Sequence, residues 1–141
     1  MGHRDRLAAA LALAGAAVVV SGPMGVLRRR LRRSWDARVA VQGDSMRPLL
    51  VPGDWLLVDP LAFRAHGPRP GDLVVVPDPR SPDRTLVKRV ASVDGDGRYD
   101  VRGDHPGAST DSRTFGPVDQ GSLAGRPWFR YWPVRRFGRI R

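Results

Sequence analysis

Hydrophobic and polar residues follow two different patterns along the chain, and the change falls near residue 35. Residues 7–20 form an unbroken run of Leu, Ala and Val with one Gly, and the stretch without charge continues to residue 27. A helix that spans a bilayer needs about 20 mainly apolar residues. The pattern predicts an N-terminal apolar helix that anchors the chain in a membrane; a cleavable signal peptide and a soluble helix are the alternatives.

After residue 35 the pattern becomes that of short β-strands separated by turns. Apolar runs or alternating residues, bounded by Gly, Pro and Asp, occur in six segments: 38–42, 55–58, 72–76, 85–93, 98–101 and 123–132. The Asp-Gly-Asp-Gly segment at 94–97 has the composition of a hairpin turn. Strands of this length and spacing predict a mainly β domain, either a sandwich or a barrel.

These patterns divide the chain into three regions. Residues 1–34 hold the apolar helix and a basic flank, residues 35–134 the β domain, and residues 135–141 a basic C-terminal tail. Much of the net charge of +10 comes from arginines at 28–33 and 135–141, on either side of a nearly balanced middle. Basic ends around a neutral body favour membrane lipid as a partner and argue against nucleic acid.

The composition also excludes several kinds of site. The chain has no cysteine, which excludes disulfides, thiolate metal sites and a cysteine nucleophile. Its three histidines, His3, His66 and His105, show no ligand spacing, and we interpret them as surface residues. The sequence therefore predicts neither a metal site nor a bound cofactor.

The first candidate for chemistry is Ser45, which follows the predicted strand 38–42 in a Gly-Asp-Ser-Met-Arg-Pro segment. Gly43 allows a tight turn and leaves space for a substrate carbonyl beside the serine. A serine in a turn is usually no more than a turn residue. Its hydroxyl also needs an adjacent base before it can act as a nucleophile.

The candidate base is Lys88, the only lysine in a chain with 23 arginines. On the alternating pattern of the strand at 85–93, it shares a face with Leu86 and Val90. Burial disfavours the charged form of an amine and lowers its pKa, whereas arginine stays protonated and cannot act as a base. A strand-edge lysine that reaches solvent is the alternative.

Six short motifs connect these two residues to a known family. They are Ser-Met-x-Pro-x-Leu at 45–50, Gly-Asp-x-Leu-Leu-Val at 53–58, Pro-Gly-Asp-Leu-Val-Val at 70–75, Val-Lys-Arg-Val at 87–90, Gly-Asp-His at 103–105 and Ser-Thr-Asp-Ser-Arg-x-x-Gly at 109–116. In this order they resemble the type I signal peptidase family, membrane-associated serine–lysine peptidases that remove leader sequences. The resemblance covers about residues 38–132 and implies a signal-peptidase-like β domain.

The resemblance implies a role for each matched residue. Ser45 attacks the scissile carbonyl and forms an acyl-enzyme, while its N–H donates into the oxyanion hole. Lys88 takes the serine proton and later activates the deacylating water, and Ser109 holds Lys88 in orientation. The other implied site residues are Asp111 and Arg113 as structural support, Met46 in the substrate pocket, Pro48 in shaping its loop, and Gly43 and Asp44 beside the nucleophile.

The sequence departs from the family pattern at the oxyanion hole. Many members carry a hydroxyl residue two positions before the nucleophile as a second donor, and this chain has Gly43 there. A second donor must therefore be a backbone N–H or be absent. The chain also lacks the large inserted subdomain of the bigger bacterial enzymes.

The function predicted from this resemblance is that of a serine endopeptidase acting on leader-bearing protein substrates. General signal-peptide processing is the first interpretation. A maturation protease for the leader of nickel-type superoxide dismutase is the second, and the compact length and the segment at 53–58 fit it well. A non-enzymatic membrane-surface protein with the same fold is an alternative of another class. A self-cleaving DNA-binding repressor would need a helix-turn-helix, which residues 1–37 do not offer.

The predicted location is the cell membrane, crossed once. The arginines after the predicted span outnumber Arg4 and Arg6 before it, so the positive-inside rule places the β domain in the cytoplasm. A general signal peptidase requires the domain outside the cytoplasm, whereas a superoxide dismutase maturation protease is compatible with a cytoplasmic domain. The sequence leaves the side open.

Overall fold

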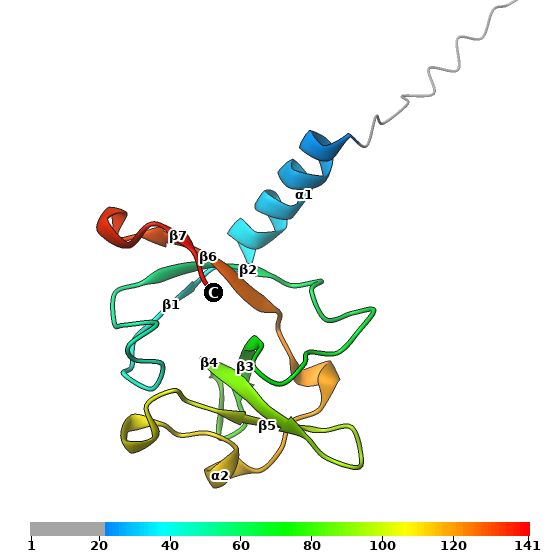
Figure 1. Cartoon of the computed structure of the whole chain (residues 1–141), viewed down its shortest axis with the longest axis vertical. Helices are drawn as coiled ribbons and strands as arrows, with labels where there is room; N and C mark the ends of the chain where they lie inside the picture. The colour runs from blue at the N-terminus through cyan, green and yellow to red at the C-terminus, as the bar shows by residue number, and fades with distance from the viewer. Residues whose placement is uncertain (1–21) are drawn as a thin grey trace, which may run out of the picture.

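The structure is a computed structural model that describes residues 22–141. Its first element is helix α1 (Pro23–Asp36). It projects from the β domain and reaches it with its C-terminal end (Figure 1). Pro23 is suited to the first helical position, because the N–H that it lacks would have no acceptor within the helix. Near the other end, the buried Ser34 hydroxyl accepts a hydrogen bond from Trp128 Nε1 at 3.0 Å.

Most of the predicted apolar helix lies outside the described residues. Residues 7–21 fall there, and residues 23–27 form the start of α1, which continues through the arginine run. Arginine and leucine are good helix formers, so the basic flank is helical rather than a loop. Between residues 22 and 141, no helix has the length and apolar composition needed to cross a membrane.

The β domain consists of two antiparallel sheets, which confirms the prediction of a mainly β fold. One sheet has the strand order β1 (Val39–Ala40), β2 (Trp55–Asp59), β6 (Arg126–Trp132), β7 (Gly138–Arg139). The other has the order β3 (Leu73–Asp78), β4 (Ser81–Val93), β5 (Tyr99–Arg102). The short helices are η1 (Pro106–Ala108), α2 (Ser112–Phe115), η2 (Gln120–Ser122) and η3 (Val134–Arg136).

The two sheets are joined at Val75 in β3. Its N–H donates to the Gly125 carbonyl at 2.9 Å, and its carbonyl accepts from the Ala124 N–H at 2.7 Å. Two apolar clusters fill the interior. One contains Phe63, Val74, Val76, Leu86, Val90, Tyr99, Val101 and Val118, and the other Val41, Met46, Leu50, Leu56 and Leu73.

Strand β4 is the longest element and carries the predicted lysine. Leu86, Lys88 and Val90 are buried, and the residues between them are partly exposed, as the alternating pattern predicts. The turn from β4 to β5 is the predicted hairpin, in which Gly97 has a φ of 77° that favours glycine. Pairing with β5 begins only at Arg89, so the earlier part of β4 has one edge without a neighbouring strand.

The C-terminal residues 135–141, predicted as a basic tail, include a short strand and pack against the domain. Strand β7 pairs with β6, and the Ile140 N–H donates to the Trp128 carbonyl at 3.1 Å. The Arg136 guanidinium donates to the Leu49 carbonyl at 3.0 Å. The charge composition could not predict these contacts. The strand pairing is made by backbone groups, and the acceptor of Arg136 lies far away in sequence.

Candidate active site

Ser45 lies in a tight turn that follows β1. The Arg47 N–H donates to the Asp44 carbonyl at 3.0 Å, and the Leu50 N–H donates to the Met46 carbonyl at 2.9 Å. Met46 and Leu50 are buried in an apolar cluster, so they anchor the turn from below. The turn thereby leaves Ser45 half-buried at the wall of a groove.

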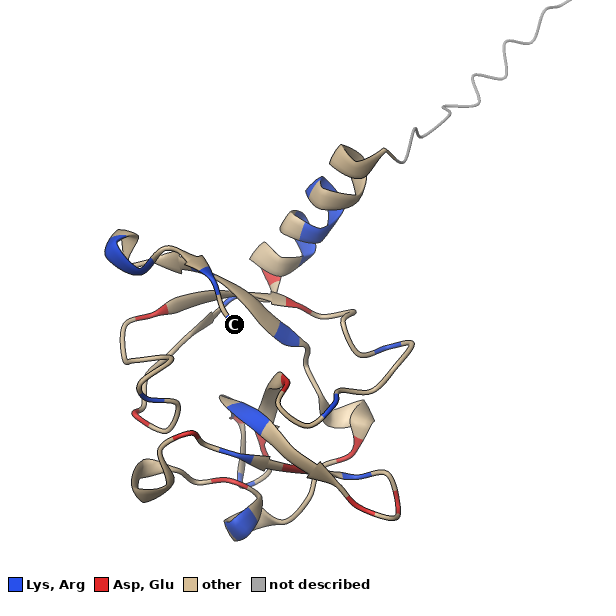
Figure 2. Cartoon of the chain, viewed as in Figure 1, with Lys and Arg blue, Asp and Glu red and all other residues tan. Residues whose placement is uncertain are grey.

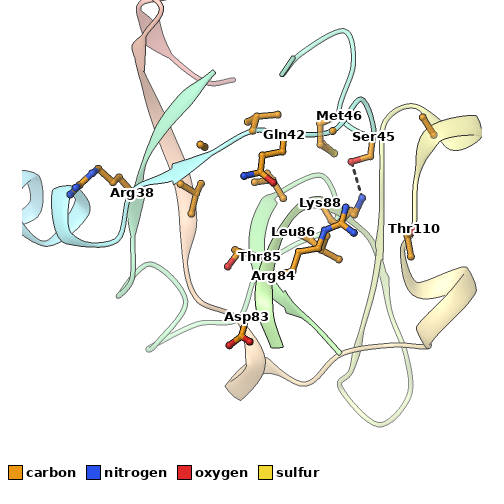
Figure 3. A pocket seen from close by; sticks show the side chains of 16 residues that line it. Arg38, Gln42, Ser45, Met46, Asp83, Arg84, Thr85, Leu86, Lys88 and Thr110 are labelled. Carbon is orange, nitrogen blue, oxygen red and sulfur yellow. Dashed lines mark hydrogen bonds between the residues drawn. The ribbon is translucent and has the colours of Figure 1, made fainter. Parts of the chain in front are cut away.

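Lys88 reaches this serine from β4, 43 positions away in sequence. Its Nζ lies 2.8 Å from Ser45 Oγ, and the two side chains point toward each other across the groove (Figure 3). The same nitrogen lies 3.2 Å from Ser109 Oγ. Lys88 is only 2% exposed, so its amine is held away from bulk water.

The environment of Lys88 favours its neutral form. Burial lowers the pKa of the amine, because removal from water disfavours the charged state. The negative charge of Asp111 opposes this effect, while the positive charges of Arg84 and Arg113 lower the pKa further. No carboxylate forms an ion pair with Lys88 within the described part of the chain, so the ammonium has no direct counter-ion.

Asp111 is the buried carboxylate behind Ser109. It accepts from Ser109 Oγ at 2.6 Å, from the Gly103 N–H at 3.1 Å, and from Arg113 Nε and Nη2 at 2.9 and 2.8 Å. Hydrogen bonds from Arg113 and Ser109 hold the pKa of Asp111 well below its usual range. The carboxylate is therefore ionised and can only accept hydrogen bonds.

This fixes the direction of the hydrogen bonds that reach Lys88. The Ser109 hydroxyl has one proton, which it donates to Asp111, so toward Lys88 it offers a lone pair and accepts. A neutral Lys88 that donates to Ser109 keeps its own lone pair for the Ser45 hydroxyl. The arrangement can draw a proton from the serine, which is the first requirement of a serine nucleophile.

The loop at 103–105 supports both ends of this arrangement, a role that sequence reasoning did not assign. The His105 N–H donates to the Ser45 carbonyl at 2.8 Å, although its side chain is exposed as predicted. A Cβ at Gly103 would lie 2.3 Å from Ser109 Oγ and 2.6 Å from the Ser45 carbonyl oxygen. Only glycine allows this approach. The Gly-Asp-His motif was the signal, but it carried no information about contacts.

Arg89 ties this loop to the strand that carries Lys88. Its Nε and Nη2 each donate to the Asp104 carboxylate at 2.8 Å, and its Nη1 donates to the Gly71 carbonyl at 2.8 Å. A two-point pair of this kind fixes orientation as well as distance. The residue next to Lys88 thus holds the loop that contacts Ser45.

A groove of about 360 Å³ runs away from Ser45 and Lys88 between two backbone edges. Residues 38–43 line one side, and residues 83–88 of β4 line the other. Strand β1 lies at the edge of its sheet, and this part of β4 has one unpaired edge. Both sides can therefore form backbone hydrogen bonds with an extended peptide.

The remaining predicted residues occupy different places around the turn. Met46 lines the groove from its buried position. Asp44 is exposed and pairs with Arg47, outside the hydrogen bonds that join Ser45 to Asp111. Pro48 is exposed and absent from the groove lining, because the turn carries it to the outer side. Gly43 does line the groove, but its φ is not positive, and a Cβ there would meet nothing within 4 Å.

Comparison with known proteins identifies the family. Residues 10–97, more than half of the chain, match the model described as signal peptidase, peptidase S26, and this region includes Ser45 and Lys88. The chain belongs to the signal peptidase family. The resemblance seen in the six motifs is thus confirmed, and the family to which the chain belongs is a family of peptidases.

Its relatives include subunits of mitochondrial inner membrane proteases. The mitochondrial ATP-independent inner membrane protease subunit 1b of Arabidopsis thaliana is 37% identical over 118 residues, which cover 68% of this chain and 70% of that protein. The human mitochondrial inner membrane protease subunit 1 is 30% identical over 122 residues, covering 73% and 74%. Subunit 2 from Danio rerio is 34% identical over 130 residues, covering 77% and 70%.

Proposed function

We propose that this member of the signal peptidase family is a serine endopeptidase that removes leader peptides with a Ser45–Lys88 dyad. The observation that carries the proposal is the 2.8 Å approach of Lys88 Nζ to Ser45 Oγ in a buried site. A buried lysine without a counter-ion is a poor structural choice, because desolvation of the ammonium is costly. Its position is accounted for if the amine acts in its neutral form as a base.

In the first half of the reaction, Ser45 Oγ attacks the scissile carbonyl carbon while Lys88 Nζ takes the hydroxyl proton. The C–N bond then breaks, and the ammonium returns that proton to the leaving amine. In the second half, neutral Lys88 takes a proton from water, and the resulting hydroxide attacks the acyl ester. The proton passes back to Ser45 Oγ as the new carboxyl product leaves.

The developing negative charge on the carbonyl oxygen needs donors that are already in place. Ser45 N–H is one candidate, since no acceptor for it exists among residues 22–141. The turn is held by buried Met46 and by the bond from His105 to the Ser45 carbonyl. These contacts support a fixed N–H that requires no reorganisation during the reaction.

The substrate binds as an extended strand in the groove. The backbone edges at 38–43 and 83–88 supply donors and acceptors on both sides. Met46 and Leu86 provide an apolar surface near the nucleophile. This architecture selects peptides that can unfold locally, as a leader joined to a mature protein does.

The protein works at a membrane surface. The relatives are named as inner membrane proteases. On α1, Met24, Val26 and Leu27 are exposed together with the neighbouring arginines, which appear in blue along the helix in Figure 2. Exposed apolar and basic side chains on one helix fit the interface of an anionic bilayer.

The test is cleavage of two leader peptides by purified wild-type and Ser45→Ala protein in detergent. One peptide carries a secretory site with small side chains, and the other is the leader of a nickel superoxide dismutase. Serine-dependent cutting of the first supports general signal-peptide processing and a domain outside the cytoplasm. Cutting of the second alone supports a maturation protease with a cytoplasmic domain. Cutting that persists in Ser45→Ala rejects the dyad.

A non-enzymatic membrane-surface protein is the alternative from another class. Such a protein has no need for a buried lysine amine within hydrogen-bond distance of two serine hydroxyls. It also has no need for an open groove beside them. Failure of folded wild-type protein to cut any leader peptide favours this alternative.

A further inference from the structure

The groove beside Ser45 contains a cation that the proposed reaction does not use. Arg84 lines the groove, and its side chain is exposed. Among residues 22–141 no carboxylate forms an ion pair with it; the nearby Asp78 is bound by Arg80 instead. A guanidinium is a strong donor for carboxylates, so an arginine without a protein partner is available to a ligand.

Arg84 points toward the reacting groups. On β4 it shares the face of Leu86 and Lys88, because side chains of a strand repeat on one face at every second residue. Figure 3 shows its side chain running toward Lys88 along the groove. Its positive charge lowers the pKa of Lys88, which agrees with this proximity.

The other charged residues of the groove do not take its place. Arg38 Nη1 donates to the Trp35 carbonyl at 2.8 Å, and its guanidinium lies 5.2 Å from the centre of the Trp35 ring. Asp83 lies toward the opposite end of the groove from Lys88 (Figure 3). Arg84 is therefore the cation that a bound peptide meets nearest to the scissile bond.

We propose that Arg84 is a specificity-determining residue that binds an acidic side chain, Asp or Glu, of the peptide substrate. This inference rests on the proposed function, since it assumes an extended peptide in the groove. In an extended peptide, side chains on one face repeat at every second residue. The acidic residue therefore lies two positions from the substrate residue whose side chain packs on Leu86 and Met46. A neutral side chain there leaves the guanidinium unpaired, and a lysine is repelled.

The experiment measures binding separately from cleavage. A neutral, fluorescently labelled Ala-rich peptide is prepared with a single Glu, Gln or Lys moved one position at a time. Binding to the Ser45→Ala protein is followed by fluorescence anisotropy at low salt. One Glu position is expected to bind about fivefold more tightly than its Gln counterpart.

Variants in the same Ser45→Ala background assign the effect to one residue. Arg84→Gln removes the preference for Glu, and Arg84→Glu reverses it in favour of Lys. Arg64→Gln is the matched control, since it removes the same charge from an exposed residue outside the groove and leaves the preference intact.

Equal affinity for Glu and Gln peptides at every position overturns the assignment, as does a preference that survives Arg84→Gln. Parallel cleavage by wild-type protein separates the two proposals. Cleavage without a preference for Glu rejects the Arg84 site alone. A Glu preference without cleavage of any leader rejects the peptidase function and retains the carboxylate site.

Discussion

The Ser109 hydroxyl lies 2.6 Å from the Asp111 carboxylate and donates its single proton to it. Lys88 must then be the donor in its own contact with Ser109. Asp111 thus determines, through Ser109, that Lys88 is the hydrogen-bond donor, although Asp111 does not contact the amine itself. Arg113 and Gly103 also donate to Asp111, so the position of this carboxylate does not depend on Ser109 alone.

Ser109→Ala tests the positioning role of this hydroxyl. Without the acceptor, the Lys88 amine can rotate its lone pair away from Ser45. We expect kcat to fall by about 100-fold while KM changes little, because the groove is intact. Steady-state kinetics on a cleaved leader peptide give both constants. A rise in KM at unchanged kcat would show that Ser109 acts in substrate binding instead.

Gly103→Ala tests the close approach of the loop to both serines. The added Cβ overlaps Ser109 Oγ and the Ser45 carbonyl oxygen, so the loop must move. We expect a loss of about 1–3 kcal/mol in the free energy of unfolding and a large loss of kcat. Gly107→Ala is the control, since its Cβ meets nothing within 4 Å. Equal unfolding midpoints and rates for the two variants would contradict the packing role.

Gly43→Ser tests whether the oxyanion site has room for a second donor. A side chain at this position enters open space in the groove, two residues before the nucleophile. We expect the new hydroxyl to raise kcat up to about tenfold by stabilising the developing oxyanion. Gly43→Ala adds the same Cβ without a donor and leaves kcat unchanged or lower. A Ser variant that behaves like the Ala variant places the oxyanion elsewhere.

The pH dependence of cleavage follows from the pKa of Lys88. Because burial lowers this pKa, kcat/KM rises with pH through a midpoint below the ordinary lysine value. Arg84 contributes to the lowering, so Arg84→Gln raises the Lys88 pKa and shifts this midpoint to higher pH. Rates measured across pH with an uncharged substrate, beside Arg64→Gln, show the shift. A shift to lower pH would have the wrong sign.

The free energy of unfolding should also depend on pH because of the lowered pKa of Lys88. A lysine whose pKa is lower in the folded than in the unfolded state destabilises the folded protein. This destabilisation is complete at pH values below the folded pKa, and it disappears as the pH rises from the folded pKa to about 10.5. We therefore expect Lys88→Met to unfold at a higher temperature than wild type near neutral pH. The difference should shrink as the pH approaches the unfolded value. A variant destabilised equally at every pH would show a purely structural lysine.

The sequence predicted the parts of this fold that depend on local pattern. The alternation of β4 placed Lys88 beside Leu86 and Val90, and the turn residues gave the hairpin that follows. The order of the motifs indicated Ser45, Lys88 and Ser109 as candidates from the sequence alone. Their catalytic roles remain predictions until the variants are measured.

Features made by contacts between distant segments could not be read in this way. The bond from His105 to Ser45 and the overlap at Gly103 depend on a loop packed against a turn nearly 60 residues earlier. Strand β7 could not be predicted from its basic sequence, because its pairing with β6 uses only backbone groups. Arg84 belongs to none of the motifs, and its role follows only from its place in the lining of the groove.

The most direct test of the dyad is the rate of leader-peptide cleavage by Lys88→Arg protein, compared with wild type. Arginine keeps a long cationic side chain but cannot accept the Ser45 proton. Circular dichroism establishes that the variant is folded, and the cleaved peptide is quantified by mass spectrometry. The account predicts a loss of about 1,000-fold or more in rate. A folded Lys88→Arg protein with full activity would contradict it.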